Sequence, residues 1–333
     1  MKLNLSFLFF SLSTVVLQSE GLTQKDVQLE NFYNWMKEFK VEYNNGKEFL
    51  ERFDIYKTND EYINKVNTQN LTYTLKHNQF SHYTNEEFSK LNNLNKYNMK
   101  RLSDVKTDFL HTERMLGKVD DFDWTTKGAV TGVKDQKQCG SCWAFSTTGS
   151  LEGVYYLKNG NLESFSEQML VDCDTNDYGC GGGLMNNAFQ WIQDNGGIEK
   201  ESDYPYTAKD GTCREKTGEI VKGTAPTSWV NVEASNEALL SAIQQQPVSV
   251  AIEADQTSFQ FYSSGVLTGK CGTNLDHGVL AVGYGTLDGI DYYKIKNSWG
   301  ESWGMDGYIL LERKDVRGGQ CGILLSASYP LLN

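Results

Sequence analysis

One stretch of the chain, residues 136–145, has the residue types for three kinds of chemistry. Cys139 and Cys142 are separated by a glycine and a serine, Gln136 lies six residues before the second cysteine, and an apolar, helix-like run follows. Such a pair could be a redox-active or metal-binding Cys-x-x-Cys motif, a plain disulfide, or a structural cysteine beside a thiol nucleophile. The surrounding sequence has to decide among them.

The seven cysteines of this 333-residue chain indicate disulfides plus one remaining thiol. Residues 1–20 are typical of a secretory signal: Lys2 is followed by a mostly apolar run, Leu3–Leu17, which is shorter than the ~20 residues of a membrane-spanning helix. Disulfides form in that pathway. No later stretch is long and apolar enough for a membrane anchor, so we expect a soluble product of the secretory pathway, destined for a lysosome or vacuole or for the outside of the cell.

Composition changes near residue 118, where two differently built parts meet. All seven cysteines and all four prolines lie after this point. Residues 21–117 hold 14 basic and 14 acidic side chains, whereas residues 118–333 hold 16 basic and 28 acidic ones, which accounts for the net charge of −12. Because an acidic domain repels phosphates, nucleic acid is not expected as a partner.

The part after residue 118 contains one histidine, His277, which leaves little choice of partner for a reactive thiol. A thiol attacks as the thiolate, and a free thiol with a pKa of ~8.5 is mostly protonated at neutral or acid pH. A helix N-terminus stabilises the thiolate, and an adjacent histidine can hold the proton. Cys142 lies where a predicted helix begins. We therefore expect Cys142 and His277 to act together, although a histidine taken alone is more often structural.

Two further groups could complete such a site. Asn297, in the sequence Asn-Ser-Trp-Gly, can accept the imidazole N–H and fix its orientation, and Trp299 can shield that bond from water. Taken alone, this segment is more typical of a turn with a packed tryptophan. Gln136 and the backbone N–H of Cys142 could form an oxyanion hole, in which the loss of one donor costs ~3 kcal/mol.

Helical patterns dominate the first part of the chain. Apolar residues from Asp26 to Tyr43 recur at steps of three and four, and a second such pattern runs from Phe49 to Val66. They predict two amphipathic helices packed on each other, followed by a short strand over 71–75. Residues 89–117 are polar and are expected to be extended or loosely ordered, and accessible to proteolysis.

The second part changes from helices to strands. Helices are predicted over 142–158, after an N-cap at Ser166, and over 185–194. Helices first and strands later predict an α+β enzyme with two lobes. The strands are predicted over 248–252, 279–284, 292–295 and 308–311.

These motifs together resemble the papain-like cysteine peptidases of the cathepsin L type. Residues 139–143, Cys-Gly-Ser-Cys-Trp, match the family signature, and His277 follows Cys142 by 135 residues, within the usual ~130–150. Residues 48–67 resemble the Glu-Arg-Phe-Asn-Ile-Asn pattern of the family's propeptides. The matching residues are Glu48, Arg52, Tyr56 in place of phenylalanine, Asn59, Ile63 and Asn67.

The resemblance implies a papain-like two-lobe fold, with a helical left lobe and a β-barrel-like right lobe, preceded by a helical propeptide domain. It implies a signal peptide at 1–20, an inhibitory propeptide of the I29 type at 21–117 that runs backwards through the cleft, and a peptidase domain at 118–333. Propeptide cleavage is expected near 114–119. Cys142 would be the nucleophile of a cysteine endopeptidase, with His277, Asn297 and Gln136 in the roles given above.

By the same resemblance, a glycine-rich segment and an apolar pocket would bind substrate. Gly182 and Gly183 would lie along the substrate backbone, and Trp299 would border the site. None of the pocket residues is charged, so we expect bulky hydrophobic residues such as Leu or Phe at P2, the second residue before the scissile bond, and poor acceptance of Arg. The pocket would be lined by Leu184, Met185, Ala251, Leu275, Gly278 and Ser326.

The resemblance also implies three disulfides among the fifteen pairings that six cysteines allow. They are Cys139–Cys180, Cys173–Cys213 and Cys271–Cys321, which leaves Cys142 as the thiol. The implied partners are polypeptide substrates, the chain's own propeptide as an intramolecular inhibitor, and cystatin-type inhibitors. We expect a monomer without cofactor or metal, working in protein degradation in an acidic compartment or outside the cell. Asn70 begins a possible glycosylation site.

A second propeptide motif, Gly-x-Asn-x-Phe-x-Asp, matches only in part. Asn78 and Phe80 fit, whereas Lys76 and His82 replace the glycine and the aspartate. Histidine titrates near ~6.5, where an aspartate titrates near ~3.9. His82 is therefore expected to alter the pH dependence of propeptide release.

Other functions fit the sequence less well. A Cys-x-x-Cys oxidoreductase would need a thioredoxin-like βαβ core, and a zinc site would need more than one histidine and closer cysteines. An inactive relative would usually lack the cysteine or the histidine. A carboxy-exopeptidase would need additional basic groups for the substrate's terminal carboxylate.

Overall fold

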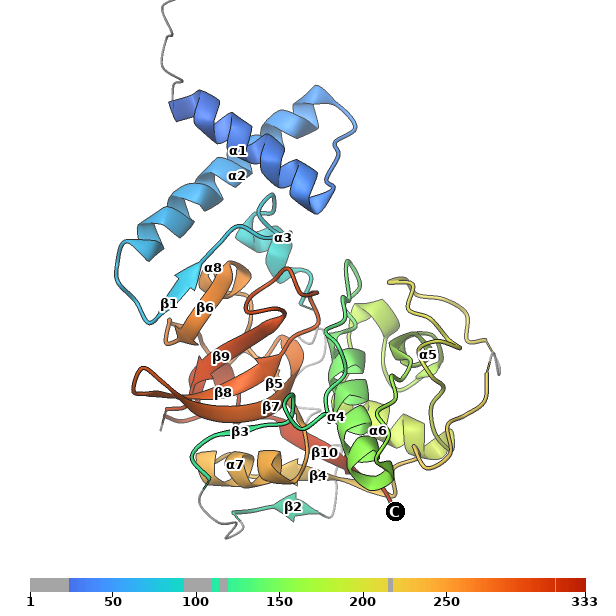
Figure 1. The fold of residues 1–333 in the computed structure, drawn as a ribbon. Coiled ribbons are helices and arrows are strands. Elements are labelled where there is room, and N and C mark those ends of the chain that lie inside the picture. Colours follow the sequence, from blue (N-terminus) through green and yellow to red (C-terminus); the bar gives the residue numbers. More distant parts are fainter. Residues whose placement is uncertain (1–23, 93–108, 114–118, 215–217, 315) are drawn as a thin grey trace, which may run out of the picture. The chain divides into compact units, whose positions relative to one another are not determined.

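The computed structural model describes residues 24–92, 109–113, 119–214, 218–314 and 316–333 (Figure 1). The predicted signal peptide and most of the predicted cleavage region lie outside these residues. The chain divides into two compact units, residues 1–43 and 44–333, which are described separately. The first contains α1 (Gln24–Phe39), in which the rings of Phe32 and Trp35 stack with centroids 5.6 Å apart.

The second unit begins with α2 (Gly46–Asn67), which confirms the second predicted helix. The Asn45 side chain caps it by accepting a hydrogen bond from Glu48 N at 3.0 Å. Its buried residues recur every three or four positions, as an amphipathic helix requires. They are Phe53, Tyr56, Asn59, Ile63 and Val66. The predicted packing of the first two helices concerns two different units and stays a prediction.

The part of the chain before residue 118 adds two strands to the sheet formed by the part after it. The predicted strand appears as β1 (Tyr73–Leu75), antiparallel to β6 (Tyr262–Leu267). After α3 (Asn85–Ser89), β2 (Leu110–His111) runs parallel to β4 (Ser228–Val232).

The prediction of extended, accessible structure holds in part for residues 109–113: they contain the strand β2, and Phe109 and Leu110 are exposed, but His111 is buried. His111 is 1% exposed, and its ring nitrogens lie 2.9 Å from the Tyr329 hydroxyl and 2.6 Å from Ser241 Oγ. Two buried polar partners therefore hold this short strand in place.

The described strands form one mixed sheet in the order β1-β6-β9-β8-β7-β5-β10-β4-β2, with β3 paired to β7. The four strands predicted after residue 245 are confirmed, and β2, β3, β4, β6 and β10 were not predicted. The remaining bounds are β3 (Phe122–Asp123), β5 (Val248–Ile252), β7 (His277–Leu287), β8 (Ile290–Lys296), β9 (Tyr308–Glu312) and β10 (Ala327–Leu331).

The three helices predicted for the peptidase region are present: α4 (Cys142–Asn159), α5 (Glu167–Cys173) and α6 (Met185–Asp194). Gly160 ends α4 in the left-handed region, at φ 71°. The Ser166 side chain caps α5 by accepting from Met169 N at 3.0 Å, as predicted. Helices that were not predicted are α3, α7 (Asn236–Gln245), α8 (Thr257–Gln260), η3 (Gly179–Gly181) and η4 (Gln320–Gly322).

Two hydrophobic cores establish the α+β, two-lobe architecture. One gathers apolar side chains of α4, α5 and α6, and the other is built on the strands and α7. Figure 1 shows α4 and α6 side by side, with β7, β8 and β9 grouped across from them. No described helix is both long and apolar enough to cross a membrane.

Three disulfides cross-link the lobes internally, with the pairs that the resemblance implied. Cys139–Cys180 and Cys173–Cys213 tie loops of the helical lobe, and Cys271–Cys321 ties the strand lobe. Each closes a loop of 40 to 50 residues, which stabilises the fold by about 4 kcal/mol on a chain-entropy model. Cys142 is outside these bridges.

Candidate active site

Cys142 is the first residue of α4 and is fully buried. The amides of Ala144 and Phe145 both bond to Ser141 O, at 2.8 and 3.3 Å, so the helix begins sharply at the cysteine. The first amides of a helix have no acceptor within it, and the helix dipole is positive there. This end of α4 therefore stabilises negative charge on a Cys142 thiolate.

The loop before Cys142 is fixed by the neighbouring disulfide. Cys139 is bonded to Cys180, and Gly140 N donates to Cys180 O at 3.1 Å. The two cysteines of the opening motif thus have different environments, because one is locked in a bridge and the other begins a helix.

His277 is the first residue of β7 and has 0% exposure. Its Nε2 lies 2.7 Å from Asn297 Oδ1, which also accepts Ser298 N at 2.8 Å. Because an amide oxygen only accepts, Nε2 carries the proton in this pair. The other ring nitrogen, Nδ1, is buried and has no hydrogen-bond partner in the described part of the chain.

The start of β7 packs directly on the start of α4. A Cβ at Gly278 would lie 3.3 Å from Cys142 O and 3.2 Å from Met185 Sδ, which is a tight contact, so the glycine favours the close approach of the two backbones. Ser146 Oγ also donates to Val279 O at 2.7 Å. The fold therefore brings His277 to the helix end that carries Cys142.

Burial controls the acidity of this histidine. It lowers the pKa of His277 to about 4, and the hydrogen bond to Asn297 opposes that shift. A thiolate at Cys142 would act in the same direction as Asn297 and raise the pKa of His277, since a thiolate and an imidazolium stabilise each other as an ion pair. The two protons are thus coupled.

Trp299 covers the His277–Asn297 pair. Its ring stacks on the imidazole with centroids 4.7 Å apart and an interplanar angle of 23°, and it is 2% exposed. Phe259 and Trp303 pack against its edges. The indole therefore lies where the sequence prediction required a shield.

Hydrogen bonds at both the oxygen and the nitrogen of the side-chain amide orient Gln136. Oε1 accepts from Ser298 Oγ at 2.6 Å, so the amide nitrogen faces the other way and donates to Cys139 O at 3.0 Å. An amide NH₂ has two donors, and this bond uses one of them. The backbone of Gln136 is held as well, because its N donates to Ser298 O and its O accepts from the Tyr206 hydroxyl. Sequence reasoning missed both Ser298 and Tyr206.

The predicted pocket residues lie together in the structure. Leu184, Met185, Ala251 and Leu275 belong to the same buried cluster as Cys142. Ala251 pairs with Gly278 across β5 and β7, and its N donates to Ser326 O at 2.9 Å. Gly183 has no room for a side chain, because a Cβ would lie 2.5 Å from the Trp143 ring.

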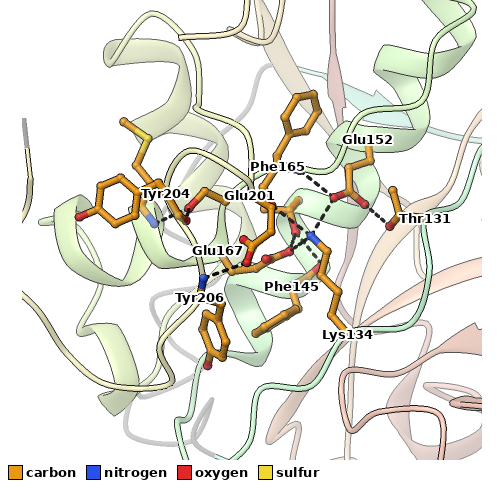
Figure 2. A network of polar contacts seen from close by, with 12 residues as sticks. Thr131, Lys134, Phe145, Glu152, Phe165, Glu167, Glu201, Tyr204 and Tyr206 are labelled. Carbon is orange, nitrogen blue, oxygen red and sulfur yellow. Dashed lines mark hydrogen bonds and ion pairs between the residues drawn. The ribbon is translucent and has the colours of Figure 1, made fainter. Parts of the chain in front are cut away.

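A buried ion cluster lies next to the site (Figure 2). Lys134 Nζ lies 3.0 Å from Glu152 Oε1 and 2.6 Å from Glu167 Oε1, and it also donates to Phe165 O. Both carboxylates are 1% exposed. Burial alone would lower the pKa of Lys134, but the two carboxylates outweigh it and raise that pKa above its usual value. An adjacent cavity of about 20 Å³, bordered by Lys296 and Asn297, has room for one water molecule.

This cluster was not predicted, although one signal was present. Glu152 is the single charged residue among the first twelve residues of α4, all of which are buried. A lone carboxylate in a buried helix requires a cation, and Lys134 supplies it. Since Lys134 lies two residues before Gln136, the ion cluster also anchors the segment that carries the amide.

The propeptide region contacts the same tryptophan. Phe80 and Phe88 pack edge-on against Trp299, with centroids 5.4 and 5.2 Å apart, and Gln79 Nε2 donates to Trp299 O at 2.5 Å. Asn78, in the partial propeptide motif, donates to Gln260 O at 2.7 Å. The predicted backwards course of the propeptide through the cleft stays a prediction, because residues 93–108 lie outside the described residues. In the part of the chain that is described, no cluster of three or more His, Cys, Asp or Glu side chains could hold a metal ion.

Comparisons with known proteins agree with this arrangement. Residues 119–331 match the family model described as papain family cysteine protease, and residues 32–88 match the cathepsin propeptide inhibitor domain (I29). The chain is 46% identical over 318 residues to probable cysteine protease RD21B of Arabidopsis thaliana, covering 93% of this chain and 68% of that one. It is 43% identical to vignain of Vigna mungo, over 99% and 94% of the two chains.

Solved proenzymes have the same fold. The proform of the ragweed pollen allergen Amb a 11, a cysteine protease, aligns with a TM-score of 0.86 at 37% identity, over 93% of this chain and 96% of that one. Digestive procathepsin L 3 from Tenebrio molitor larval midgut aligns with a TM-score of 0.82 at 37% identity, over 92% and 99%.

The ion cluster yields a stability prediction. Lys134→Met removes the lysine that forms ion pairs with the buried Glu152 and Glu167, so we expect the free energy of unfolding to fall by about 3–5 kcal/mol. Urea unfolding of the proenzyme measures this loss of stability. The proenzyme carries Cys142→Ser in every variant, so that no reactive thiol is present. Lys200→Met, which breaks the exposed ion pair with Glu163, is the matched control and should change little. Equal effects of the two substitutions would contradict the assignment.

Proposed function

Because this chain belongs to the papain family of cysteine proteases and carries a cathepsin propeptide inhibitor domain, we propose that it is an endopeptidase using Cys142, His277 and Asn297. It is made as a proenzyme in which the propeptide is an intramolecular inhibitor. The observation that carries the proposed mechanism is the start of α4 packed on the start of β7, with His277 Nε2 bound to Asn297 and Nδ1 left for a proton from the thiol.

In the proposed mechanism, His277 Nδ1 takes the thiol proton, and the α4 N-terminus together with the imidazolium stabilises the thiolate. Sγ attacks the scissile carbonyl, and the Nδ1 proton passes to the leaving amine, which departs as the acyl thioester forms. Nδ1 then deprotonates a water that hydrolyses the thioester. Asn297 keeps the imidazole in one tautomer throughout, because its Oδ1 accepts the Nε2 proton.

The oxyanion of each tetrahedral intermediate would be held by two donors, the backbone N–H of Cys142 and the second amide proton of Gln136. The orientation imposed by Ser298 supports this role, because it turns Nε2 rather than Oε1 away from Ser298. The donors are fixed before the reaction, so no reorganisation is needed when charge develops.

Gln136→Ala is therefore expected to lower kcat by about 100-fold with little change in KM. Steady-state hydrolysis of a Phe-Arg reporter peptide by the acid-activated enzyme checks this.

Cys142→Ser should abolish both hydrolysis and labelling by a thiol-directed epoxide. Residual peptidase activity in Cys142→Ser would refute the assignment of the nucleophile.

We further propose a preference for bulky hydrophobic P2 residues. The pocket residues Leu184, Met185 and Leu275 are apolar and at most 3% exposed, and Ser326 is the polar side chain among the predicted pocket residues. An arginine side chain would lose its hydration there without gaining a carboxylate partner.

A Phe-Arg reporter should thus have a kcat/KM at least about 10-fold above that of an Arg-Arg reporter. Ser326→Glu should narrow this ratio, since a carboxylate in the pocket can pair with a guanidinium. Ser326→Gln is the matched neutral control and should leave the ratio unchanged. Equal rates of the parent enzyme on both reporters would rule out the proposed pocket.

His82 is proposed to set the pH of propeptide release. Arg52 donates to His82 O at 3.0 Å and to Glu87 at 2.7 Å, and the His82 ring stacks on Tyr83. Burial, and then the Arg52 charge, lower the pKa of His82 to about 4, against the smaller opposing effects of Glu87 and Glu48. The folded propeptide therefore resists a proton that the unfolded one binds below ~6.5, so the folded, inhibitory form of the propeptide loses stability as pH falls from there towards 4.

His82→Asp should move the midpoint of propeptide cleavage to lower pH, because an aspartate beside Arg52 stays charged in that range. The measurement is cleavage of Cys142→Ser proenzymes, with and without His82→Asp, by a fixed amount of mature enzyme at each pH. The ratio of the two rates cancels the pH dependence of the protease. An unchanged ratio across pH 4–6.5 would eliminate this role for His82.

We also propose the domain bounds, the location and the binding partners that the sequence predicts. Residues 1–20 are a signal peptide, 21–117 the propeptide and 118–333 the peptidase domain, which supports entry into the secretory pathway and a site of action in a lysosome, vacuole or the extracellular space. The substrates are polypeptides, the enzyme acts as a monomer in protein degradation, and cystatin-type inhibitors bind its cleft.

A further inference from the structure

Two buried aspartates lie beside the glycine segment of the proposed substrate site. Asp174 directly follows α5, and Asp177 lies two residues before η3. They are 5% and 7% exposed. Neither has a role in the mechanism above.

Each aspartate has one well-bonded oxygen and one without a donor. Asp174 Oδ1 accepts from Asn176 N at 2.8 Å, and Asp177 Oδ1 accepts from Leu184 N at 3.0 Å and Asn187 Nδ2 at 2.9 Å. Both Oδ2 atoms are buried without a hydrogen-bond partner, and within the described residues neither aspartate forms an ion pair with a base. A buried carboxylate oxygen in this position needs a proton or a cation.

The two carboxyl groups lie close enough to hydrogen-bond directly to each other. Two anions cannot do so, but an acid and a carboxylate can. Burial raises the pKa of Asp174 to about 6, and burial together with the Asp174 charge raises the pKa of Asp177 well above its ordinary value. The pair therefore titrates as a unit that keeps one proton after ordinary aspartates have lost theirs.

The pair is directly bonded to the segment that would bind substrate. Asp177 holds the Leu184 amide, and the next residue, Tyr178, donates its N to Gly182 O at 2.9 Å. Gly183 lies so close that a Cβ there would be 2.7 Å from Asp177 Cγ. Every residue from 182 to 184 is thus in contact with residues 177–178.

We propose that Asp174 and Asp177 share one proton and are positioning residues for the substrate-binding segment 182–184, so that peptide binding weakens when this proton is lost. This inference rests on the proposed function, because it takes Gly182 and Gly183 to lie along the substrate backbone. Loss of the proton leaves two adjacent anions, whose repulsion displaces Asp177 and with it the Leu184 amide.

Charges on the neighbouring segments do not replace the proton. Asp172 of α5 bonds to the Tyr204 hydroxyl and Gly211 N, and Asp210 accepts Cys180 N at 2.6 Å. Tyr178 is exposed, and α6 contributes the neutral Asn187. These neighbours are neutral or acidic, so none of them supplies a positive charge in place of the shared proton.

The test uses variants that supply the shared hydrogen permanently. In Asp177→Asn the amide oxygen still accepts the Leu184 amide, while Nδ2 donates to Asp174; Asp174→Asn does the reverse. For a substrate with three residues before the scissile bond, KM of the parent enzyme should rise about 10-fold between pH ~5 and ~8, and KM of both variants should stay flat within about twofold. Asp210→Asn changes charge at the same loop without touching the pair, and should retain the parental pH dependence.

A blocked single-residue ester does not reach residues 182–184. It therefore distinguishes failure of the shared-proton proposal from failure of the proposed peptidase function. Its pH profile should be the same in the parent and the variants, because it reports Cys142 and His277. If the parent cleaves both substrates but the Asn variants keep the parental rise in KM, the shared proton is disproved while the proposed function stands. If the parent cleaves neither substrate, the proposed function itself fails.

A direct measurement covers the case in which the variants do not fold. In Cys142→Ser protein with ¹³C-labelled aspartate carboxyls, NMR should show two carboxyl resonances that titrate together, with a step above pH ~6. Asp276, whose pKa is raised by burial to about 8, gives a separate single titration in that range. Absence of a coupled pair of resonances above pH ~6 would overturn the proposal. So would a KM that rises with a chelator and recovers with calcium, because the pair would then hold a cation instead of a proton.

Discussion

The close approach of α4 to β5 and β7 is the constraint on which the site depends. Small residues on one face of the helix make it possible: a Cβ at Gly149 would lie 2.9 Å from the Leu280 side chain, and one at Gly153 would lie 2.5 Å from Pro247. Larger residues would push the helix away from the sheet, since interiors are too densely packed to absorb them. Cys142 and His277 come from opposite sides of this contact, so the lobe interface itself assembles the pair to which we assign the reaction.

Buried charge near the site is neutralised in two different ways. Glu152 and Glu167 are compensated by Lys134, which costs desolvation of three ions but fixes the segment leading to Gln136. Asp174 and Asp177 have no such cation among the described residues, and we assign them a shared proton. In the first arrangement Lys134 stays charged because the two carboxylates raise its pKa, whereas the second depends on a proton that is lost as pH rises.

Trp299 has two sets of neighbours that connect catalysis with inhibition. Its face covers the imidazole of His277, and its edges meet Phe80 and Phe88 of the propeptide region. The aromatic cluster around Trp299 therefore shields the His277–Asn297 hydrogen bond from water and also contacts the propeptide region. This sharing makes the propeptide part of the same packed core that supports the site.

The sequence by itself determined the nucleophile candidate, its histidine and the main helices. An odd cysteine count, one histidine after residue 118 and local helix signals at Cys142, Ser166 and Gly160 sufficed, because each is a short-range or counting argument. It did not predict β10, which contains Pro330, or the burial of His111, because both depend on pairing with distant strands. Only the tertiary structure decided that Ser298 turns the Gln136 amide, that Lys134 meets Glu152 and Glu167, and that two aspartates face each other. The physical reason is that hydrogen bonds and ion pairs between residues far apart in the chain leave no periodic trace in the sequence.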